Sequence, residues 1–442
     1  MLKVALGLLM TGAAASAQAA PFQPTVAKTQ VEQILSREAA HLDALYRDIH
    51  QHPELAFMEK ATATKLAREM RAAGFVVTER VGGTGLVAVM KNGPGPTVLV
   101  RTELDALPMA ERSGLPYASR VRTTWQGRPT PVAHSCGHDI HMAAWVGAAR
   151  ALREMKGEWS GTLIFVGQPA EETTSGARAM LADGFVKRFG KPDYAFALHV
   201  TPAPAGTVFY RSGPMSSTSD ALEIVFHGRG GHGSAPAATI DPVLMAARFT
   251  VDVQSIISRE KAPEAFGVVT IGAIQAGEAG NVIPDNAVVR GTIRSQDEGV
   301  RAKLLAGIKR TARAVSEMAG APPADITITP GGKMVVNDSV LSARTEALFK
   351  EAFAEGAQRF PIVMSGSEDF SEFAELGVPS VYFLIGGLDP AFFSRALASG
   401  RLPINHSPDF APEPEPTITT GATAMALAVM NVANRSAQAD DS

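Results

Sequence analysis

The sequence predicts an α/β protein built around a mostly parallel sheet. Short, continuous apolar stretches alternate with helical patterns, as expected for strands that helices cover on both faces. Polar side chains follow several of these stretches directly, beside glycine or proline. Because ligands of open α/β sheets bind beyond the carboxyl ends of the strands, we expect these side chains to meet in one site.

The length and composition indicate two domains and exclude some partners. A chain of 442 residues is long enough for about two domains. A net charge of −3 argues against nucleic-acid or membrane partners, which require a basic surface. The single cysteine, Cys136, excludes an intramolecular disulfide.

The amino terminus predicts a secretory signal peptide. Lys3 precedes an apolar stretch that ends near Ala15, and Ala17-Gln-Ala19 matches the A-x-A cleavage pattern. The apolar stretch is shorter than the roughly 20 residues that cross a bilayer. We therefore expect residues 1–19 to be removed and the chain to be exported, to a periplasm or outside the cell. The alternative is an uncleaved amino-terminal tail.

The two outer parts of the chain, residues 26–213 and 331–436, predict one catalytic domain. Apolar residues at helical spacing occupy residues 29–74, and an alanine-rich helix is expected up to about residue 155. The predicted apolar strands lie at residues 85–90, 97–102, 161–166, 194–198 and 378–385.

The middle of the chain, residues 214–330, predicts a second domain inserted into the first. Its elements follow the order β-α-β-β-α-β of the ferredoxin-like arrangement. Strands are predicted at residues 220–227, 265–273, 287–294 and 325–329, and helices at 241–258 and 297–319. Glycine and proline at both ends would form the hinges.

Residues 134–141 read His-Ser-Cys-Gly-His-Asp-Ile-His and indicate a metal site. Cys136 and His138 are two residues apart, so in an extended stretch both side chains share one face. A thiolate beside imidazoles is typical of metal ligation. Two alternatives stay open: a buried cysteine that acts as a small apolar residue, and a nucleophile that histidine activates.

Other candidate groups also follow predicted strands. Glu171 and Glu172 come after Gln-Pro-Ala, and one could bind metal while the other takes a proton from water. Alternatively, they could be a solvated first turn of a helix. His199 follows an apolar strand, where a histidine taken alone is more often part of the core. His406, in an Asn-His-Ser-Pro loop, gains a role only from the resemblance described next.

Eight ordered motifs between about residues 40 and 430 resemble one family. They read LYRDIHQHPEL from residue 45, RTELDALP from 101, CGHDIH from 136, QPAEE from 168, GRGGHGSAP from 228, NVIP from 281, SEDF from 367 and NHSP from 405. In these motifs the chain resembles the dinuclear metal amidohydrolases of the aminoacylase/carboxypeptidase (metallopeptidase) superfamily. The subgroup it resembles is that of hippurate hydrolase and the indoleacetyl-amino-acid hydrolases.

The resemblance implies two divalent metal ions, which could be zinc, manganese, cobalt or nickel. The implied metal ligands are Cys136, His138, Glu172, His199 and His406. Glu171 would be the general base, and Asp105 would orient a ligand. His232 of the inserted domain would hold the scissile carbonyl oxygen, within one chain or across a dimer. Asn281 and Arg294 would hold a substrate carboxylate.

The implied activity is hydrolysis of the amide bond of small N-acyl amino acids or dipeptide-like conjugates by a homodimer. The inserted domain would be both a lid and the dimer contact. The rival functions are a non-catalytic binding protein on the same fold and a thiol hydrolase that uses Cys136. The chain departs from the subgroup at Glu103, where aspartate is usual. It also carries longer stretches near Trp125 and at Leu388–Leu402, which could line the substrate entrance.

Overall fold

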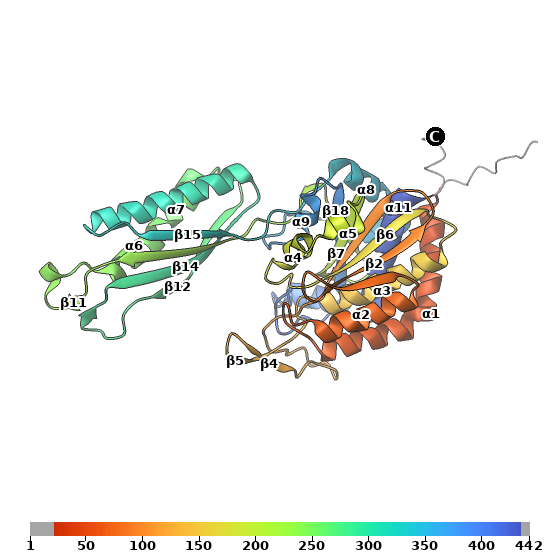
Figure 1. The fold of residues 1–442 in the computed structure, drawn as a ribbon, viewed down its shortest axis with the longest axis horizontal. Coiled ribbons are helices and arrows are strands. Elements are labelled where there is room, and N and C mark those ends of the chain that lie inside the picture. Colours follow the sequence, from red (N-terminus) through yellow and green to blue (C-terminus); the bar gives the residue numbers. More distant parts are fainter. Residues whose placement is uncertain (1–21, 435–442) are drawn as a thin grey trace, which may run out of the picture.

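The computed structural model describes residues 22–434 and divides into two lobes (Figure 1). The larger lobe contains an eight-stranded sheet, and the smaller lobe contains a four-stranded sheet with two long helices. The signal peptide predicted at residues 1–19 lies outside the described residues, as do residues 435 and 436. Within residues 22–434, no helix combines the length and apolar character needed to cross a membrane.

The eight-stranded sheet is mostly parallel, as the sequence predicts. Its strands, in spatial order, are β1 (Val76–Val81), β2 (Gly85–Asn92), β6 (Gly161–Gln168), β3 (Thr97–Glu103), β7 (Tyr194–Pro204), β18 (Ser380–Leu388), β8 (Val208–Tyr210) and β17 (Ala357–Arg359). The central strands β6, β3, β7 and β18 are parallel. Antiparallel pairing is limited to β1 with β2, β2 with β6, and β18 with β8.

Helices cover both faces of this sheet. Val98 and Val100 of β3 enter the core on one face, and Leu99 enters the core on the other. The first core also contains α1 (Pro24–Gln51), α2 (Lys60–Ala72), α3 (His138–Glu154), α8 (Ser339–Phe353) and α11 (Pro414–Ala433). The second contains α4 (Gly176–Ala182), α5 (Phe185–Phe189) and α9 (Ser371–Ala374). Burial on both faces explains why the central strands are continuous apolar runs.

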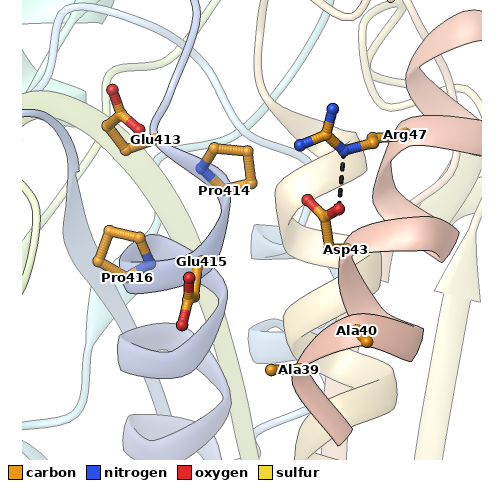
Figure 2. A pocket seen from close by; sticks show the side chains of 8 residues that line it. All are labelled: Ala39, Ala40, Asp43, Arg47, Glu413, Pro414, Glu415 and Pro416. Atoms are coloured by element: carbon orange, nitrogen blue, oxygen red, sulfur yellow. Dashed lines mark hydrogen bonds and ion pairs between the residues drawn. The ribbon is translucent and has the colours of Figure 1, made fainter. Parts of the chain in front are cut away.

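The two stretches that are longer than usual form surface elements of the larger lobe. The stretch near Trp125 is a hairpin of β4 (Arg122–Trp125) and β5 (Arg128–Pro131). Part of Leu388–Leu402 forms α10 (Pro390–Ala398). Elsewhere, a surface hollow of about 420 Å³ lies between α1 and the start of α11 (Figure 2). Its lining includes the Asp43–Arg47 ion pair and none of the predicted site residues.

The smaller lobe is an antiparallel sheet covered by helices. Its strands, in spatial order, are β12 (Gly267–Gln275), β14 (Asn286–Ser295), β10 (Asp220–His227) and β15 (Asp325–Pro330). Leu222, Ile224 and Phe226 of β10 alternate into a core with α6 (Pro242–Asp252) and α7 (Glu298–Met318). The chain order is β-α-β-β-α-β, as expected. The helix predicted at 241–258 is shorter, because α6 gives way to a π-helical turn, η2 (Ile256–Glu260).

Short elements complete the two lobes. Strands β9 (Gly213–Pro214) and β16 (Val336–Asn337) pair where the chain passes between the lobes. Strands β11 (Gly231–His232) and β13 (Val282–Ile283) pair at the tip of the smaller lobe that lies farthest from the larger one (Figure 1). Two short 3₁₀ helices are η1 (Pro236–Ala238) and η3 (Ala354–Gly356).

Candidate metal centre and active site

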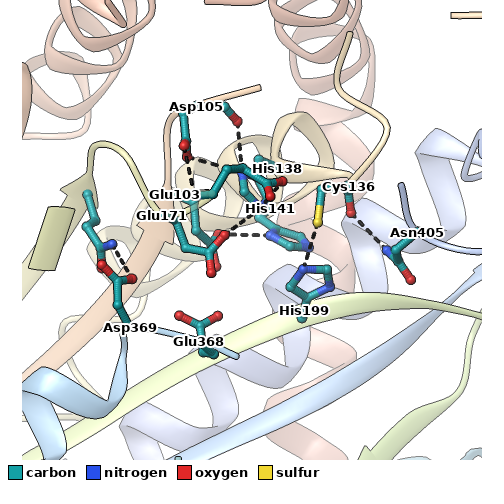
Figure 3. Close-up of polar contacts among 12 residues, drawn as sticks. Glu103, Asp105, Cys136, His138, His141, Glu171, His199, Glu368, Asp369 and Asn405 are labelled. Atoms are coloured by element: carbon teal, nitrogen blue, oxygen red, sulfur yellow. Dashed lines mark hydrogen bonds and ion pairs between the residues drawn. The ribbon is translucent and has the colours of Figure 1, made fainter. Parts of the chain in front are cut away.

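The candidate site lies beside β3, β6 and β7, where polar side chains from separate segments meet (Figure 3). Glu103 is the last residue of β3, and Glu171 and Glu172 follow β6. The sequence suggested that His199 ends its strand, but in the structure the strand continues beyond it. Strand β7 continues to Pro204 because β18 pairs along it, with Leu384 opposite His199.

The loop that carries Cys136 and His138 depends on a glycine. Gly137 has φ 95°, and a Cβ there would lie 2.4 Å from the side chain of Val200. A larger residue would therefore be both strained and in collision. The loop is also fixed from the carboxyl-terminal side of the chain. The amide of Asn405 donates to the carbonyl of Cys136 at 3.0 Å, and the N–H of His406 donates to the carbonyl of Ser135 at 2.8 Å.

The five predicted metal ligands converge in the larger lobe. The Cys136 Sγ atom lies 3.3 Å from His199 Nε2 and 3.2 Å from His406 Nε2. The two oxygens of Glu172 face different histidines, with Oε1 3.9 Å from His138 Nε2 and Oε2 3.4 Å from His406 Nε2. These contacts link all five side chains into one cluster.

The ring nitrogens of two histidines are already oriented for ligation. His138 Nδ1 donates to the carbonyl oxygen of Asp105 at 2.8 Å, and His199 Nδ1 donates to that of Val200 at 2.8 Å. Each ring therefore presents the lone pair of Nε2 toward the cluster. His141 differs, because its Nδ1 donates to Glu103 and its Nε2 accepts from the Val200 N–H. Both ring nitrogens of His141 are therefore occupied by hydrogen bonds, unlike Nε2 of His138.

Two features of the cluster fit divalent cations: the types of its donor atoms, and the presence of buried polar atoms that lack a hydrogen-bond partner. His138 Nε2 and Glu172 Oε1 are buried without a hydrogen-bond partner among the described residues. Burial and the Glu172 carboxylate raise the pKa of the Cys136 thiol, and burial raises the pKa of Glu172 to about 7. A cation would satisfy the orphaned atoms and stabilise the thiolate and the carboxylate. Thiolate, imidazole and carboxylate ligands suit zinc and its neighbours in the first transition row.

Glu171 lies against this cluster without a hydrogen bond to its own carboxylate among the described residues. Its Oε2 atom lies 3.7 Å from His138 Nε2. Burial and the nearby carboxylates of Glu368 and Glu172 raise the pKa of Glu171 well above its usual range. A carboxylate of raised pKa beside a metal cluster is suited to accept a proton.

A buried arginine organises the other side of the site, and sequence reasoning gave it no role. Arg101 is fully buried, and its guanidinium donates to Glu368 at 2.6 Å, to Asp369 at 3.1 Å and to Gln168 at 2.9 Å. It also contacts Glu103. The signal in the sequence was a charged residue inside an apolar strand, since such a residue is seldom buried without partners.

The same network shows what Glu103 does in this chain. One carboxylate oxygen contacts Arg101, and the other accepts from His141 Nδ1 at 2.9 Å. His141 in turn accepts the N–H of Val200, the residue that follows His199. Glu103 thus links the buried arginine to the strand that carries a predicted ligand.

The structure does not bring all predicted residues together within one chain. His232 and Asn281 are exposed at the tip of the smaller lobe, at and beside the β11–β13 pair (Figure 1). Arg294 lies nearer to the larger lobe, where its Nη1 atom donates to the carbonyl of Ser365 at 3.3 Å. His406 is 55% exposed, and partial desolvation with the charges of His138 and Arg294 lowers its pKa.

Relatives of known name share most of the chain. A thermostable carboxypeptidase 2 of Saccharolobus solfataricus is 34% identical over 394 residues, 88% of this chain and 94% of the relative. The hippurate hydrolase of Campylobacter jejuni is 35% identical over 352 residues, 77% of this chain and 87% of the relative. An IAA-amino acid hydrolase ILR1-like 2 of Arabidopsis thaliana is 32% identical over 370 residues, 81% of this chain and 79% of the relative.

Solved structures agree with these relatives. A putative aminohydrolase of methicillin-resistant Staphylococcus aureus superposes with a TM-score of 0.80 at 28% identity, covering 92% of this chain and all of the other. A Bacillus subtilis protein described as a dinuclear metal-binding peptidase gives 0.72 at 29% identity, over 90% of this chain and 99% of the other. The sequence model of Peptidase family M20/M25/M40 matches residues 99–430, and the chain therefore belongs to that family.

Proposed function

We propose that this metal-dependent hydrolase cleaves the amide bond of small N-acyl amino acids or dipeptide-like conjugates. The observation that carries the proposal is the meeting of five ligand side chains with the buried carboxylate of Glu171. The names of the relatives support this substrate class, since they include a hippurate hydrolase, an N-acetylcysteine deacetylase and an IAA-amino acid hydrolase.

In this proposal, two divalent ions are held by Cys136, His138, Glu172, His199 and His406. When bound, such ions polarise a carbonyl and lower the pKa of water. Softness of the cysteine ligand favours zinc, and manganese, cobalt and nickel are the alternatives. Glu171 takes the proton of the attacking water on its carboxylate and later donates it to the leaving amine. Asp105 keeps His138 oriented through its backbone carbonyl.

The proposed substrate contacts come from the smaller lobe. Arg294 lies close enough to affect the pKa of His406, and its guanidinium suits a bidentate contact with a substrate carboxylate. The His232 Nδ1 atom accepts the N–H of Ser234 at 3.1 Å, so the ring proton sits on Nε2. That N–H can donate to a developing oxyanion. Asn281, on the segment paired with β11, is the second proposed contact for the carboxylate.

We also propose that residues 214–330 form an independent lid domain that makes the chain a homodimer. His232 and Asn281 lie at the tip of the smaller lobe, far from the metal cluster of their own chain (Figure 1). This supports a dimer, because a second chain could bring its own His232 and Asn281 to that cluster. Large apolar side chains lie exposed on the helices of this lobe, with Leu244 58%, Val251 72% and Met318 60% exposed. Such exposed apolar residues on one lobe are typical of a protein contact.

The export of the chain remains a proposal from residues 1–19. The A-x-A pattern predicts cleavage after Ala19. Amino-terminal sequencing of the protein from a periplasmic or culture fraction tests this. An intact Met1 in that fraction would contradict cleavage.

A panel of N-acyl amino acids and dipeptides, assayed with and without a chelator, tests the function. We expect hydrolysis of some members, loss of hydrolysis after metal removal, and recovery with zinc or manganese. A thiol hydrolase would stay active after chelation and lose activity with a thiol-alkylating reagent. A non-catalytic binding protein would bind panel members without turnover.

A further inference from the structure

The turn that carries Glu171 has a strained backbone. Ala170 has φ 51° and Thr174 has φ 47°, a left-handed region that residues with a Cβ atom seldom adopt. The turn is also tight, since a Cβ at Gly176 would lie 1.5 Å from the carbonyl oxygen of Pro169. A strained conformation of this kind persists only where surrounding groups hold it.

The group that holds Ala170 is the carboxylate of Glu59. The N–H of Ala170 donates to Glu59 Oε1 at 2.8 Å, and the hydroxyl of Thr84 donates to the other oxygen. Glu59 is completely buried and is the residue that precedes α2, while Thr84 immediately precedes β2. Two separate elements therefore fix the carboxylate that reaches the turn.

A second carboxylate holds the other side of Glu171. The N–H of Glu172 donates to Asp105 Oδ2 at 3.0 Å. The N–H groups of Ala170 and Glu172, the two neighbours of Glu171 in the chain, thus each donate to a buried acid. The two acids differ in one respect. Asp105 also contacts the predicted ligand His138, whereas the side-chain hydrogen bonds of Glu59 within the described residues go to Ala170 and Thr84.

We propose that Glu59 is a positioning residue for hydrolysis. By accepting the N–H of Ala170, it holds the left-handed turn and thereby aims the Glu171 carboxylate at the metal cluster. The inference rests on the proposed role of Glu171. The contact requires an acceptor oxygen at this place, which glutamine also provides. The left-handed turn should depend less on this contact when residue 170 is glycine, because glycine adopts positive φ without strain.

Steady-state kinetics and metal analysis of variants of the full chain test the proposal. Glu59→Ala is expected to lower kcat roughly 100-fold, the effect of displacing a reacting group by about 1 Å, with KM and metal content near wild type. Glu59→Gln should restore most of the rate. Ala170→Gly alone should be close to wild type, and in the Glu59→Ala background it should recover roughly tenfold in kcat.

Glu69→Ala is the matched control, because Glu69 is a buried acid of α2, the helix that Glu59 precedes, and it pairs with His41 and Arg150 instead. It should lower the melting temperature and leave kcat unchanged. An unchanged kcat in Glu59→Ala would overturn the proposal, as would a loss that neither glutamine nor glycine recovers. If Glu59→Ala does not fold, Thr84→Val can be used instead, because it removes only the hydroxyl that orients Glu59. An unchanged kcat in Thr84→Val would also overturn the proposal.

Hydrogen exchange separates this inference from the proposed function. Glu59→Ala should speed amide exchange in residues 169–176 relative to the Glu69→Ala control, whether or not a substrate is known. Suppose that exchange becomes faster and the wild-type protein hydrolyses no member of the panel. That result would support the role of Glu59 in holding the turn and contradict the proposed hydrolytic function. Unchanged exchange in an active enzyme would reject the role of Glu59 and keep the function.

Discussion

The two lobes present their predicted site residues in opposite ways. In the larger lobe, Glu171 and His138 are buried, and the rings and backbone around them are held by hydrogen bonds. In the smaller lobe, His232 and Asn281 are exposed at a distant tip. All five proposed metal ligands and Glu171 thus meet within one chain. The half of the site that would bind substrate needs movement of the lobe or a second chain.

The largest expected effect comes from the larger lobe. Glu171→Gln removes a base but no ligand, so kcat should fall by about 10²–10⁴-fold while metal content stays near wild type. Cys136→Ser should instead lower metal occupancy and activity together. Atomic emission spectroscopy and steady-state rates measure both. A Glu171→Gln variant that keeps more than a few per cent of kcat would exclude this residue as the base.

The smaller lobe is tested by mixing two inactive variants. His232→Ala removes an oxyanion donor and should lower kcat by about 10²–10³-fold. If His232 acts on the partner chain, a heterodimer of His232→Ala with Glu171→Gln contains one intact site. After subunit exchange the mixture should recover about one quarter of wild-type activity. Mixtures that stay inactive although mass spectrometry detects heterodimers would show that His232 does not act across a dimer.

The junction of the lobes should give an intermediate effect. If Arg294 holds the substrate carboxylate, amidating that carboxyl should lower kcat/KM by roughly one to two orders of magnitude, because a charge-assisted pair is lost. Arg294→Ala should erase most of this preference, since the same contact cannot be lost twice. Equal rates on free and amidated substrates by the wild type would indicate that the pocket recognises another group. The stretches near Trp125 and Leu388–Leu402 would then be the next candidates.

The smallest expected effect concerns Glu103, which links Arg101 to His141. Glu103→Asp shortens the side chain by one methylene and cannot keep both contacts at their present lengths. We expect metal affinity to fall roughly tenfold through the less firmly held His199. Competitive titration with a chromophoric chelator measures this change. Glu69→Asp, on a buried acid outside the site, should leave metal affinity unchanged.

The sequence predicted those parts of the candidate site that are local in the chain. The Cys136–His138 loop and the Glu171–Glu172 pair lie next to predicted strands. Strand position and residue type were therefore sufficient to predict that these side chains lie close together. The mostly parallel sheet followed from continuous apolar runs for the same reason. The family membership that these motifs indicated is confirmed by the match over residues 99–430.

What sequence reasoning missed are contacts between distant segments. Arg101 meets Glu368, 267 residues away, and Glu59 meets Ala170, 111 residues away. No spacing rule connects such pairs, because their approach is set by the packing of the whole sheet. The distance of His232 from the metal cluster also depends on how two lobes are placed, which apolar periodicity does not describe.

The order of strands in the larger sheet has a consequence for synthesis on the ribosome. Strand β18 lies between β7 and β8, yet it follows them in the chain by the whole length of the smaller lobe. Every strand of the smaller lobe is translated before β18, so that lobe can fold first. Until then, β7 keeps an open edge that invites pairing with other chains. A nascent chain stalled just before β18 should therefore hold one finished lobe and one sheet that needs a chaperone.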